Sequence, residues 1–284
     1  MLTVECDNND MDQIENLKKK SRNMRKRILE LTYSTGKNGA HLGGALSAVE
    51  IIATVYDQVL RYDVNDPSGK NRDRFIVSKG HCAIALYTAL EQVGFLTKEE
   101  LDTFETNGAP YYAHASRNIL KGIEFSGGSL SLGLSFAVGV AIANKRDGLN
   151  NHVYVLVGDG ECNEGLVWES LMSAAHFNLN NLTVIVDQNG LQSDGNTEDI
   201  MNCASLAAKF SSFGFHSQEV DGHDVAALCD AFRLRNQELP NAIIARTIKG
   251  KGVSFMENNR DWHHASLSQK QYELALAEQD DRDK

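Results

Sequence analysis

Proline, paired cysteines and long hydrophobic runs are all scarce in this sequence. Only three prolines occur among 284 residues, so no proline-rich linker divides the chain. The five cysteines are odd in number and none has CxxC or zinc-finger spacing, which is typical of a reduced, cytoplasmic protein. The most apolar stretch, residues 130–143, is interrupted by Ser and Gly and is too short to cross a membrane, so it predicts a buried helix.

Positive charge is also in deficit. Lys and Arg number 28 against 38 Asp and Glu, which gives a formal net charge of −10. This balance argues against a nucleic-acid partner or an anionic membrane surface, and the acidic N-terminus MLTVECDNND does not resemble a secretion signal. A phosphate ligand stays compatible with the charge, because a bound divalent cation reverses the sign locally.

The apolar pattern predicts an α/β fold, with a parallel sheet covered by helices on both faces. Strands are expected at 75–78, 153–157, 182–186, 215–220 and 242–248, and helices at 11–32, 45–60, 82–93, 163–177, 204–213 and 225–235. We expect a single domain over residues 1–284. It has a mobile helical arm at about 1–35, whose basic face is solvated, and a charged tail at about 268–284.

Polar clusters follow two neighbouring predicted strands. Gly158-Asp159-Gly160 ends one strand, and Asp187-Gln188-Asn189-Gly190 ends the next. Ligands bind at the carboxyl ends of parallel strands, so these clusters are expected to converge. Asp159 and Asn189 offer oxygen ligands that suit Mg²⁺ or Ca²⁺, and the glycines let the backbone approach a phosphate closely.

Each cluster by itself has an ordinary structural explanation. Gly-Asp-Gly after a strand is often only a tight turn, and Asn-Gly is a common hairpin signal. The segment DQNGLQSDG is similar to a calcium loop but lacks the acid at its fifth position and the closing Glu.

In combination the two clusters are specific. Gly158-Asp159-Gly160, then roughly thirty residues, then an apolar strand ending in Asp187-Gln188-Asn189 resembles the signature of thiamine-diphosphate enzymes. The resemblance implies a metal held by Asp159, Asn189 and the backbone oxygen of Leu191.

Further segments resemble transketolase. They span roughly residues 22–267 and are GAHLGG at 39–44, RDRFIVSKGH at 72–81, GGSLSLG at 127–133, ECNEG at 161–165, DGHD at 221–224, KGKGV at 249–253 and WHH at 262–264. The chain is thus identified as similar to the diphosphate-binding half of that family, with the corresponding fold.

The resemblance assigns roles to individual residues. His41, His114 and His264 would face the substrate and move protons, and Glu164 would act at a subunit contact near the cofactor. The cofactor would be bound by His81, Gly128, Leu130, Gly158, Asp159, Gly160, Asn189 and His264. Three other histidines, His176, His216 and His223, are expected to be structural.

The sequence also departs from the family pattern. The usual Gly-Gln of the cofactor-wrapping segment is Ser131-Leu132, the Gly after the last His is Ala265, and the Pro after the first His is Leu42. Because Leu132 lacks the side-chain amide of the usual Gln near the cofactor, the identity of the donor and acceptor sugars is left open. Pentose phosphates are the default, and an unusual ketose or a modified acceptor in a specialised pathway is the alternative.

The implied reaction transfers a two-carbon ketol unit from a ketose phosphate to an aldose. In the family, a Glu that activates the cofactor and basic residues that grip the sugar phosphate lie in a second, pyrimidine-binding domain. We expect a partner chain, resembling the C-terminal part of transketolase, to supply both. The expected assembly is a heterotetramer with two copies of each component, and this chain alone should expose an apolar face.

Other functions remain open at this stage. The chain could be the alpha subunit of a 2-oxo-acid dehydrogenase, which shares the Gly-Asp-Gly and Asn signature, or a cofactor-binding half that serves only as a scaffold. His41, the SKGH segment and the pair His263-His264 favour transketolase. A deoxyxylulose-phosphate synthase is disfavoured because that enzyme is one long chain.

Overall fold

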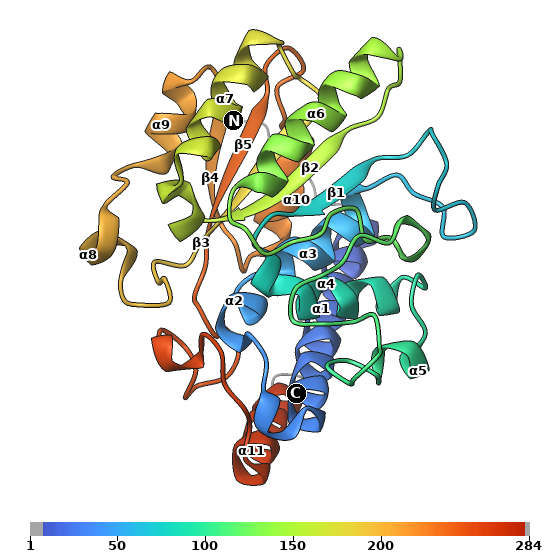
Figure 1. The fold of residues 1–284 in the computed structure, drawn as a ribbon, viewed down its shortest axis with the longest axis vertical. Helices are drawn as coiled ribbons and strands as arrows, with labels where there is room; N and C mark the ends of the chain where they lie inside the picture. The colour runs from blue at the N-terminus through green and yellow to red at the C-terminus, as the bar shows by residue number, and fades with distance from the viewer. Residues whose placement is uncertain (1–7, 282–284) are drawn as a thin grey trace.

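The computed structural model describes residues 8–281, so Cys6 lies outside the described residues. Its centre is one parallel sheet in the order β1-β2-β3-β5-β4 (Figure 1). The strands are β1 Arg74–Val77, β2 Val153–Gly158, β3 Leu182–Gln188, β4 His216–Asp221 and β5 Asn241–Arg246. The predicted α/β architecture is therefore confirmed.

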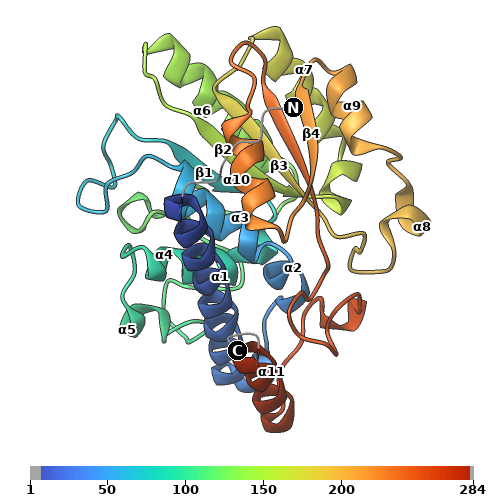
Figure 2. The ribbon, with the colours of Figure 1, turned by 180° about the vertical axis from the view of Figure 1, so that it is seen from behind.

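Helices cover both faces of the sheet, as Figures 1 and 2 show from opposite sides. The longer helices are α1 Asn8–Ser34, α4 Ala83–Gln92, α6 Leu132–Arg146, α7 Gly165–His176, α9 Leu206–Ser212, α10 Val225–Arg233 and α11 Gln269–Asp281. The shorter ones are α2 Leu42–Leu46, α3 Val49–Thr54, α5 Lys98–Leu101 and α8 Thr197–Met201.

Side chains alternate between the two faces of the sheet along β2. Val155 and Val157 pack on the side of α6, α7 and α9, whereas Tyr154 and Leu156 pack on the side of α1, α3, α4 and α10.

The helix predicted at 45–60 is wrong in both its start and its continuity. Helix formation begins three residues earlier, pauses between α2 and α3, and ends in a π-helical turn at Val55–Val59. The interruption coincides with Ser47, whose hydroxyl donates a hydrogen bond of 2.6 Å to the Asp187 carboxylate at the end of β3. The pause thus falls at the residue that ties this segment to the end of β3, which the local pattern does not reveal.

The ends of the described chain also differ from expectation. Leu17, Met24 and Ile28 on α1 are buried against the body, so the expectation of a mobile arm is wrong for the described residues. The predicted charged tail forms α11, which packs along α1 with the rings of Tyr33 and Tyr272 stacked at 4.4 Å. The apolar stripe of α1 outweighs its charged face, because burying that stripe removes apolar area from water.

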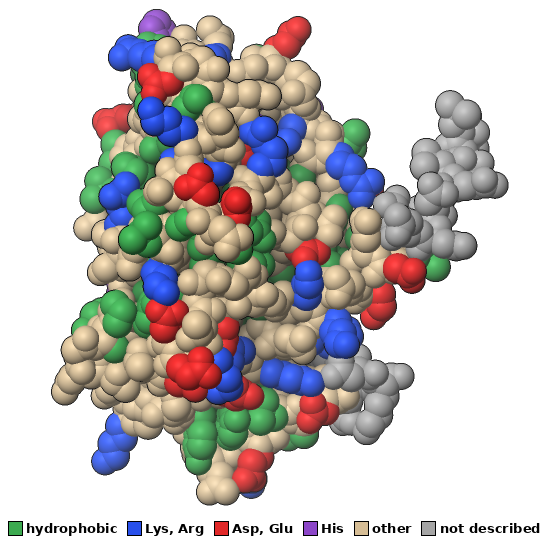
Figure 3. Space-filling model, turned by 90° about the vertical axis from the view of Figure 1, so that its right-hand side faces the viewer, with side chains coloured by type: hydrophobic (Ala, Val, Ile, Leu, Met, Phe, Trp, Pro, Cys, Tyr) green, Lys and Arg blue, Asp and Glu red, His purple; other side chains and the backbone are tan. Residues whose placement is uncertain are grey.

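The length and apolarity of the helices, the surface charge and the exposure of α6 bear on function. No described helix is both long and apolar enough to span a membrane. On the face drawn in Figure 3, basic and acidic side chains are interspersed, and neither sign forms a continuous field. Helix α6 is only half-buried, contrary to prediction, because Leu132 and Phe136 face outward.

Candidate active site

The two polar clusters meet at the carboxyl edge of the sheet. Gly158 pairs with Asp187 in the β2–β3 register, and the amide of Asp159 donates to the Asp187 carbonyl at 3.2 Å. The Asp159 carboxylate accepts hydrogen bonds from the amides of Gly160 at 2.8 Å and Gly190 at 2.7 Å. The convergence expected from the sequence is therefore present in the fold.

A cavity of 350 Å³ opens at this edge. Most of the residues predicted for the site line it, namely His41, His81, His114, Leu130, Gly158, Asp159, Gly160, Asn189 and Leu191. Gly128, Glu164 and His264 are not among its lining residues, although Gly128 packs directly behind it: a Cβ on Gly80 would lie 2.5 Å from the Gly128 amide. This volume suits one extended small molecule.

Three residues that can offer hard oxygen ligands line the cavity together. They are Asp159 through its carboxylate, Asn189 through the amide oxygen that accepts from Leu191 N at 3.1 Å, and Leu191 through the carbonyl that also accepts from Lys249 Nζ at 3.0 Å. Burial, and then the neighbouring Asp187, raise the pKa of Asp159. A divalent cation would relieve that penalty, so the donor set fits Mg²⁺ or Ca²⁺ shared with diphosphate oxygens.

Beneath the cavity lies a buried ion pair between Lys79 and Asp187. Burial alone would raise the pKa of Asp187, but the Lys79 ammonium and the hydroxyls of Ser47 and Thr247 outweigh it and hold the pKa below its usual value. Lys79 also donates to the Gly44 carbonyl at 2.9 Å. The pair is internally neutralised, so it forms a rigid floor and leaves little net charge for a ligand.

Four histidines gather around His41. Its ring centroid lies 4.6 Å from His264, 5.3 Å from His114, 5.4 Å from His263 and 5.8 Å from His81. Burial, followed by repulsion from these neighbours, lowers the pKa of His41 to about 3. His41 is therefore neutral near pH 7, and its buried Nδ1 has no hydrogen-bond partner, so a ligand hydroxyl could satisfy it.

The cluster depends on a two-residue bridge between distant segments. The Ala40 amide donates to the Ala265 carbonyl at 3.0 Å, and the Ala265 amide donates back at 3.1 Å. Gly39 makes this approach feasible. Its φ is +68°, and a Cβ there would lie 2.4 Å from the Ala265 oxygen. The glycine thus sets His41 against His264.

Gly39→Ala is expected to destabilise the protein by about 1–3 kcal/mol, because the new methyl group forces the Ala40–Ala265 bridge apart. Urea unfolding would measure the loss. Gly36→Ala is the matched control, since Gly36 has a φ of +60° but open space around its Cβ. Equal losses in the two variants would show that the bridge contributes nothing beyond backbone strain.

Lys249 and His263 are site residues that the sequence reasoning missed. The Lys249 ammonium is buried and donates to the carbonyls of Leu191 at 3.0 Å and Gln192 at 3.1 Å, and lies 3.0 Å from His263 Nδ1. Burial, then repulsion from Lys79, lowers the pKa of Lys249 to about 8. The sequence signal for His263 was its place in the His263-His264 pair. The sequence alone, however, does not say which of the two rings enters the cavity.

Glu161 is a third residue whose role the sequence did not reveal. It is buried, accepts hydrogen bonds from the amides of Ser131 at 2.7 Å and Gly158 at 3.0 Å, and also binds the Ser78 hydroxyl. Ser131 has a φ of +69°, a conformation that glycine adopts more easily. Glu161 therefore holds the segment that departs from the family pattern, and its position directly after Gly-Asp-Gly was the available signal.

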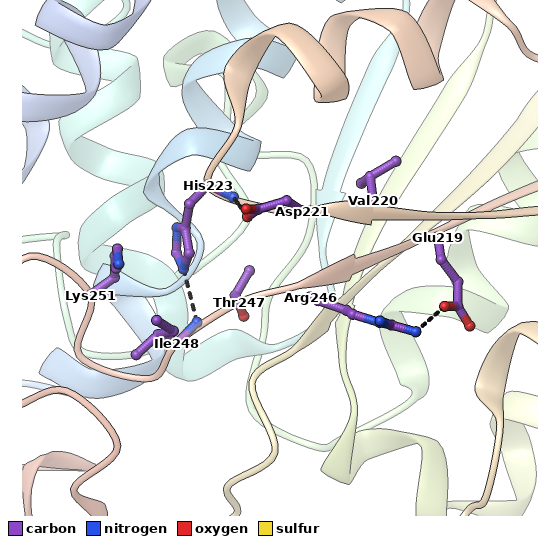
Figure 4. Close-up of a pocket in the computed structure, with 8 residues that line it drawn as sticks. All are labelled: Glu219, Val220, Asp221, His223, Arg246, Thr247, Ile248 and Lys251. Atoms are coloured by element: carbon purple, nitrogen blue, oxygen red, sulfur yellow. Dashed lines mark hydrogen bonds and ion pairs between the residues drawn. The ribbon is translucent and has the colours of Figure 1, made fainter.

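The remaining predicted residues lie apart from the cavity. Glu164 is exposed at the start of α7, and Leu132 of the departing segment is exposed at the start of α6. His223 sits at the end of β4 and makes structural contacts, as expected, with its ring directed at the Ile248 amide (Figure 4). The thiols of Cys82 and Cys162 are buried, and burial raises their pKa values, so both are inert.

Comparison with known proteins extends the argument from geometry to family. The family model described as transketolase, thiamine diphosphate binding domain, matches residues 18–279. The chain is 38% identical over 272 residues to one of the subunits of the apulose-4-phosphate transketolase of Phocaeicola vulgatus, covering 95% of this chain and 96% of that protein. It is 39% identical over 246 residues to the 6-deoxy-6-sulfo-D-fructose transketolase subunit SqwG of a Clostridium species, covering 86% and 90%.

The solved structures agree in fold. Transketolase from Leishmania mexicana superposes with a TM-score of 0.86 at 28% identity, over 93% of this chain. This chain spans only 41% of the length of that transketolase. Family membership favours ketol transfer over the 2-oxo-acid dehydrogenase interpretation of the shared signature. The chain belongs to the transketolase family and forms its thiamine-diphosphate-binding domain.

Proposed function

We propose that this chain is the cofactor-binding component of a two-component transketolase that moves a ketol unit from a ketose phosphate to an aldose, with Mg²⁺ or Ca²⁺ as its metal. One observation carries the proposal. The oxygens of Asp159, Asn189 and Leu191 share a single cavity with His41, His81, His114 and His263. Metal-ligand oxygens on one side and proton-transfer groups on the other are the two parts that the reaction needs.

Thiamine diphosphate, when bound, supplies the carbanion and electron sink for cleavage and formation of the carbon–carbon bond. The protein's task is to hold and orient it. Asp159, Asn189 and Leu191 would hold the metal, and His81 and Lys249 would face the diphosphate. The Lys249 ammonium has only carbonyl and imidazole partners among its described hydrogen bonds, so an anion nearby would offset its burial.

The histidines would serve the sugar. Burial and repulsion keep His41 and His263 neutral, with the pKa of His263 lowered to about 4. His41 can present one donor and one acceptor to the sugar, whereas His263, whose Nδ1 accepts from Lys249, can present its Nε2–H donor. His263 lines the cavity directly, while His264 packs on His41. The proton-transfer role expected for His264 therefore needs to be tested beside His263.

Alanine variants of the histidines are expected to separate two roles. His81→Ala should mainly weaken cofactor affinity. Replacement of a proton-transfer histidine, His263 or His264, should mainly lower kcat by about 10²–10⁴. Steady-state kinetics of both variants with the natural sugar pair would identify which ring transfers protons. Unchanged kcat and kcat/KM in either variant would remove that residue from the mechanism.

We also infer the partner. Both relatives described above are named as subunits of transketolases, and outward-facing apolar side chains lie on two adjacent helices, Leu132 and Phe136 on α6, Met172 on α7 and Phe177 directly after α7. Such a surface is typical of an obligate contact. The proposed partner carries the pyrimidine-binding domain, and the proposed assembly is a cytoplasmic heterotetramer of two plus two.

The donor sugar remains a choice between pentose phosphates and a less common ketose. The names of the two relatives refer to apulose 4-phosphate and 6-deoxy-6-sulfo-D-fructose, one a sugar phosphate and the other a sugar sulfonate. These names, together with Ser131-Leu132 in the cofactor-wrapping segment, support a specialised anionic ketose as the alternative substrate. A scaffold role without catalysis is the minor alternative, and ketol transfer by the assembled complex would rule it out.

A further inference from the structure

The Asp221-Gly222-His223-Asp224 motif has no part in the function proposed above. His223 follows β4 and lines a second pocket (Figure 4), and it is not among the residues that line the proposed cofactor cavity. Its Nε2 accepts a hydrogen bond of 2.8 Å from the Ile248 amide. Because Nε2 accepts, the N–H of the ring is at Nδ1, which is 3.0 Å from a Glu50 oxygen and donates to it.

Glu50 extends this contact into a buried charge cluster. Its carboxylate, on α3, forms an ion pair of 2.5 Å with Arg25 of α1, and the two side chains are 9% and 6% exposed. Arg25 in turn donates from Nε to the Lys251 carbonyl at 3.1 Å. His223 and Arg25 therefore grip the two ends of one turn, Ile248 to Lys251, and Glu50 orients both.

The middle of that turn is equally constrained. The Gly250 amide donates to the Gly43 carbonyl at 2.9 Å, and Gly250 has a φ of +79° with its Cβ position 2.4 Å from the Met256 oxygen. The Lys249 side chain then passes close to Gly43, where a Cβ would lie 2.9 Å from Lys249 Cγ, on its way into the cavity. The backbone of the turn thus aims the ammonium at the cofactor site.

A buried ammonium needs such support. The hydrogen bonds described for Lys249 are to neutral groups. If the turn could relax, the ammonium would therefore move out of the cavity, because water solvates its charge better than these partners do. We propose that His223 is a positioning residue: with Glu50 and Arg25 it clamps the turn from Ile248 to Lys251 and so holds Lys249 against the diphosphate. This inference rests on the proposed role of Lys249.

A double-mutant cycle tests the proposal on the full chain. His223→Ala, Lys249→Met and the double variant would be titrated with thiamine diphosphate and Mg²⁺ by calorimetry. His223→Ala should weaken binding about tenfold, as supporting residues of a binding site commonly do. Lys249→Met should weaken it at least as much, and the double variant no more than Lys249→Met, because His223 acts through Lys249.

Hydrogen exchange provides a readout that needs no cofactor. Amides of the turn, Ile248 above all, should exchange faster in His223→Ala, but not in Lys249→Met or in the control His216→Gln, which alters another histidine of the β4 region. If His223→Ala does not fold, His223→Gln keeps an acceptor for the Ile248 amide and should show a smaller change of the same kind.

The outcomes separate this inference from the proposed function. Affinity losses that add in the double variant, or unchanged exchange of the turn in the His223 variants, would overturn the clamp while leaving the role of Lys249 intact. Unchanged affinity in Lys249→Met would overturn that role and the clamp with it. Tenfold weaker binding together with faster exchange confined to the turn supports both.

Discussion

Purified by itself and supplied with thiamine diphosphate, Mg²⁺ and a ketose–aldose pair, this chain is expected to show no ketol transfer. Its cavity holds the proposed metal-ligand residues and the histidine cluster, but the family's ring-activating Glu belongs to a second domain. The chain matches 96% of the length of its relative from the apulose-4-phosphate transketolase and only 41% of a solved transketolase. Activity should appear when a protein with the pyrimidine-binding domain, encoded for instance by a neighbouring gene, is added.

Size-exclusion chromatography with light scattering would follow the same experiment. The mixture should form a larger complex that buries the apolar surface of Leu132, Phe136, Met172 and Phe177. Phe136→Glu should prevent assembly without unfolding the chain, because a charge at a buried apolar contact is costly and Phe136 is exposed when the chain is alone. Full turnover by the chain without a partner would mean that an internal residue activates the cofactor, and the two-component proposal would be abandoned.

Asp159→Ala is expected to abolish cofactor binding while leaving the fold intact. The Asp159 carboxylate is the one charged member of the proposed metal-ligand set, and without it a diphosphate would enter a chain of net charge −10 poorly neutralised. For the assembled wild type, cofactor and Mg²⁺ at about a hundredfold excess over Kd should stabilise the native state by about 2.7 kcal/mol. The melting temperature of the variant should not move.

The control for this experiment is Asp199→Ala. Asp199 is an exposed carboxylate on α8, beyond the same loop, and it bonds only to Asn196 among its described side-chain contacts. Its replacement changes net charge equally but should preserve the full thermal response. If Asp159→Ala and wild type rose equally with cofactor, Asp159 would not belong to the metal site.

Much of the fold followed from local patterns. Apolar runs such as 153–157 and 182–186 identified buried parallel strands, and the turns after them located Asp159 and Asn189 at one edge of the sheet. This inference succeeds because the carboxyl ends of adjacent parallel strands meet whatever the rest of the chain does. The family resemblance then supplied roles that spacing alone left ambiguous between turns and ligands.

The tertiary structure decided what depends on contacts between distant segments. Ser47, where the predicted helix pauses, bonds to Asp187, 140 residues away, a contact that no local pattern reveals. The apolar stripe of α1 makes a packed helix of a segment whose charges suggested a mobile arm. Lys249 and Glu161 gained their roles only when carbonyls and amides from other loops surrounded them.

The choice between His263 and His264 shows the limit most clearly. The sequence by itself determined that a histidine pair follows Trp262, and therefore that an imidazole is available near the cofactor. Which ring enters the cavity is set by the Ala40–Ala265 bridge, whose close approach depends on the left-handed φ of Gly39. Residue types and the periodicity of strands can be read from short stretches of sequence. The direction of a side chain in a loop depends instead on backbone hydrogen bonds between distant segments, which form only in the folded chain.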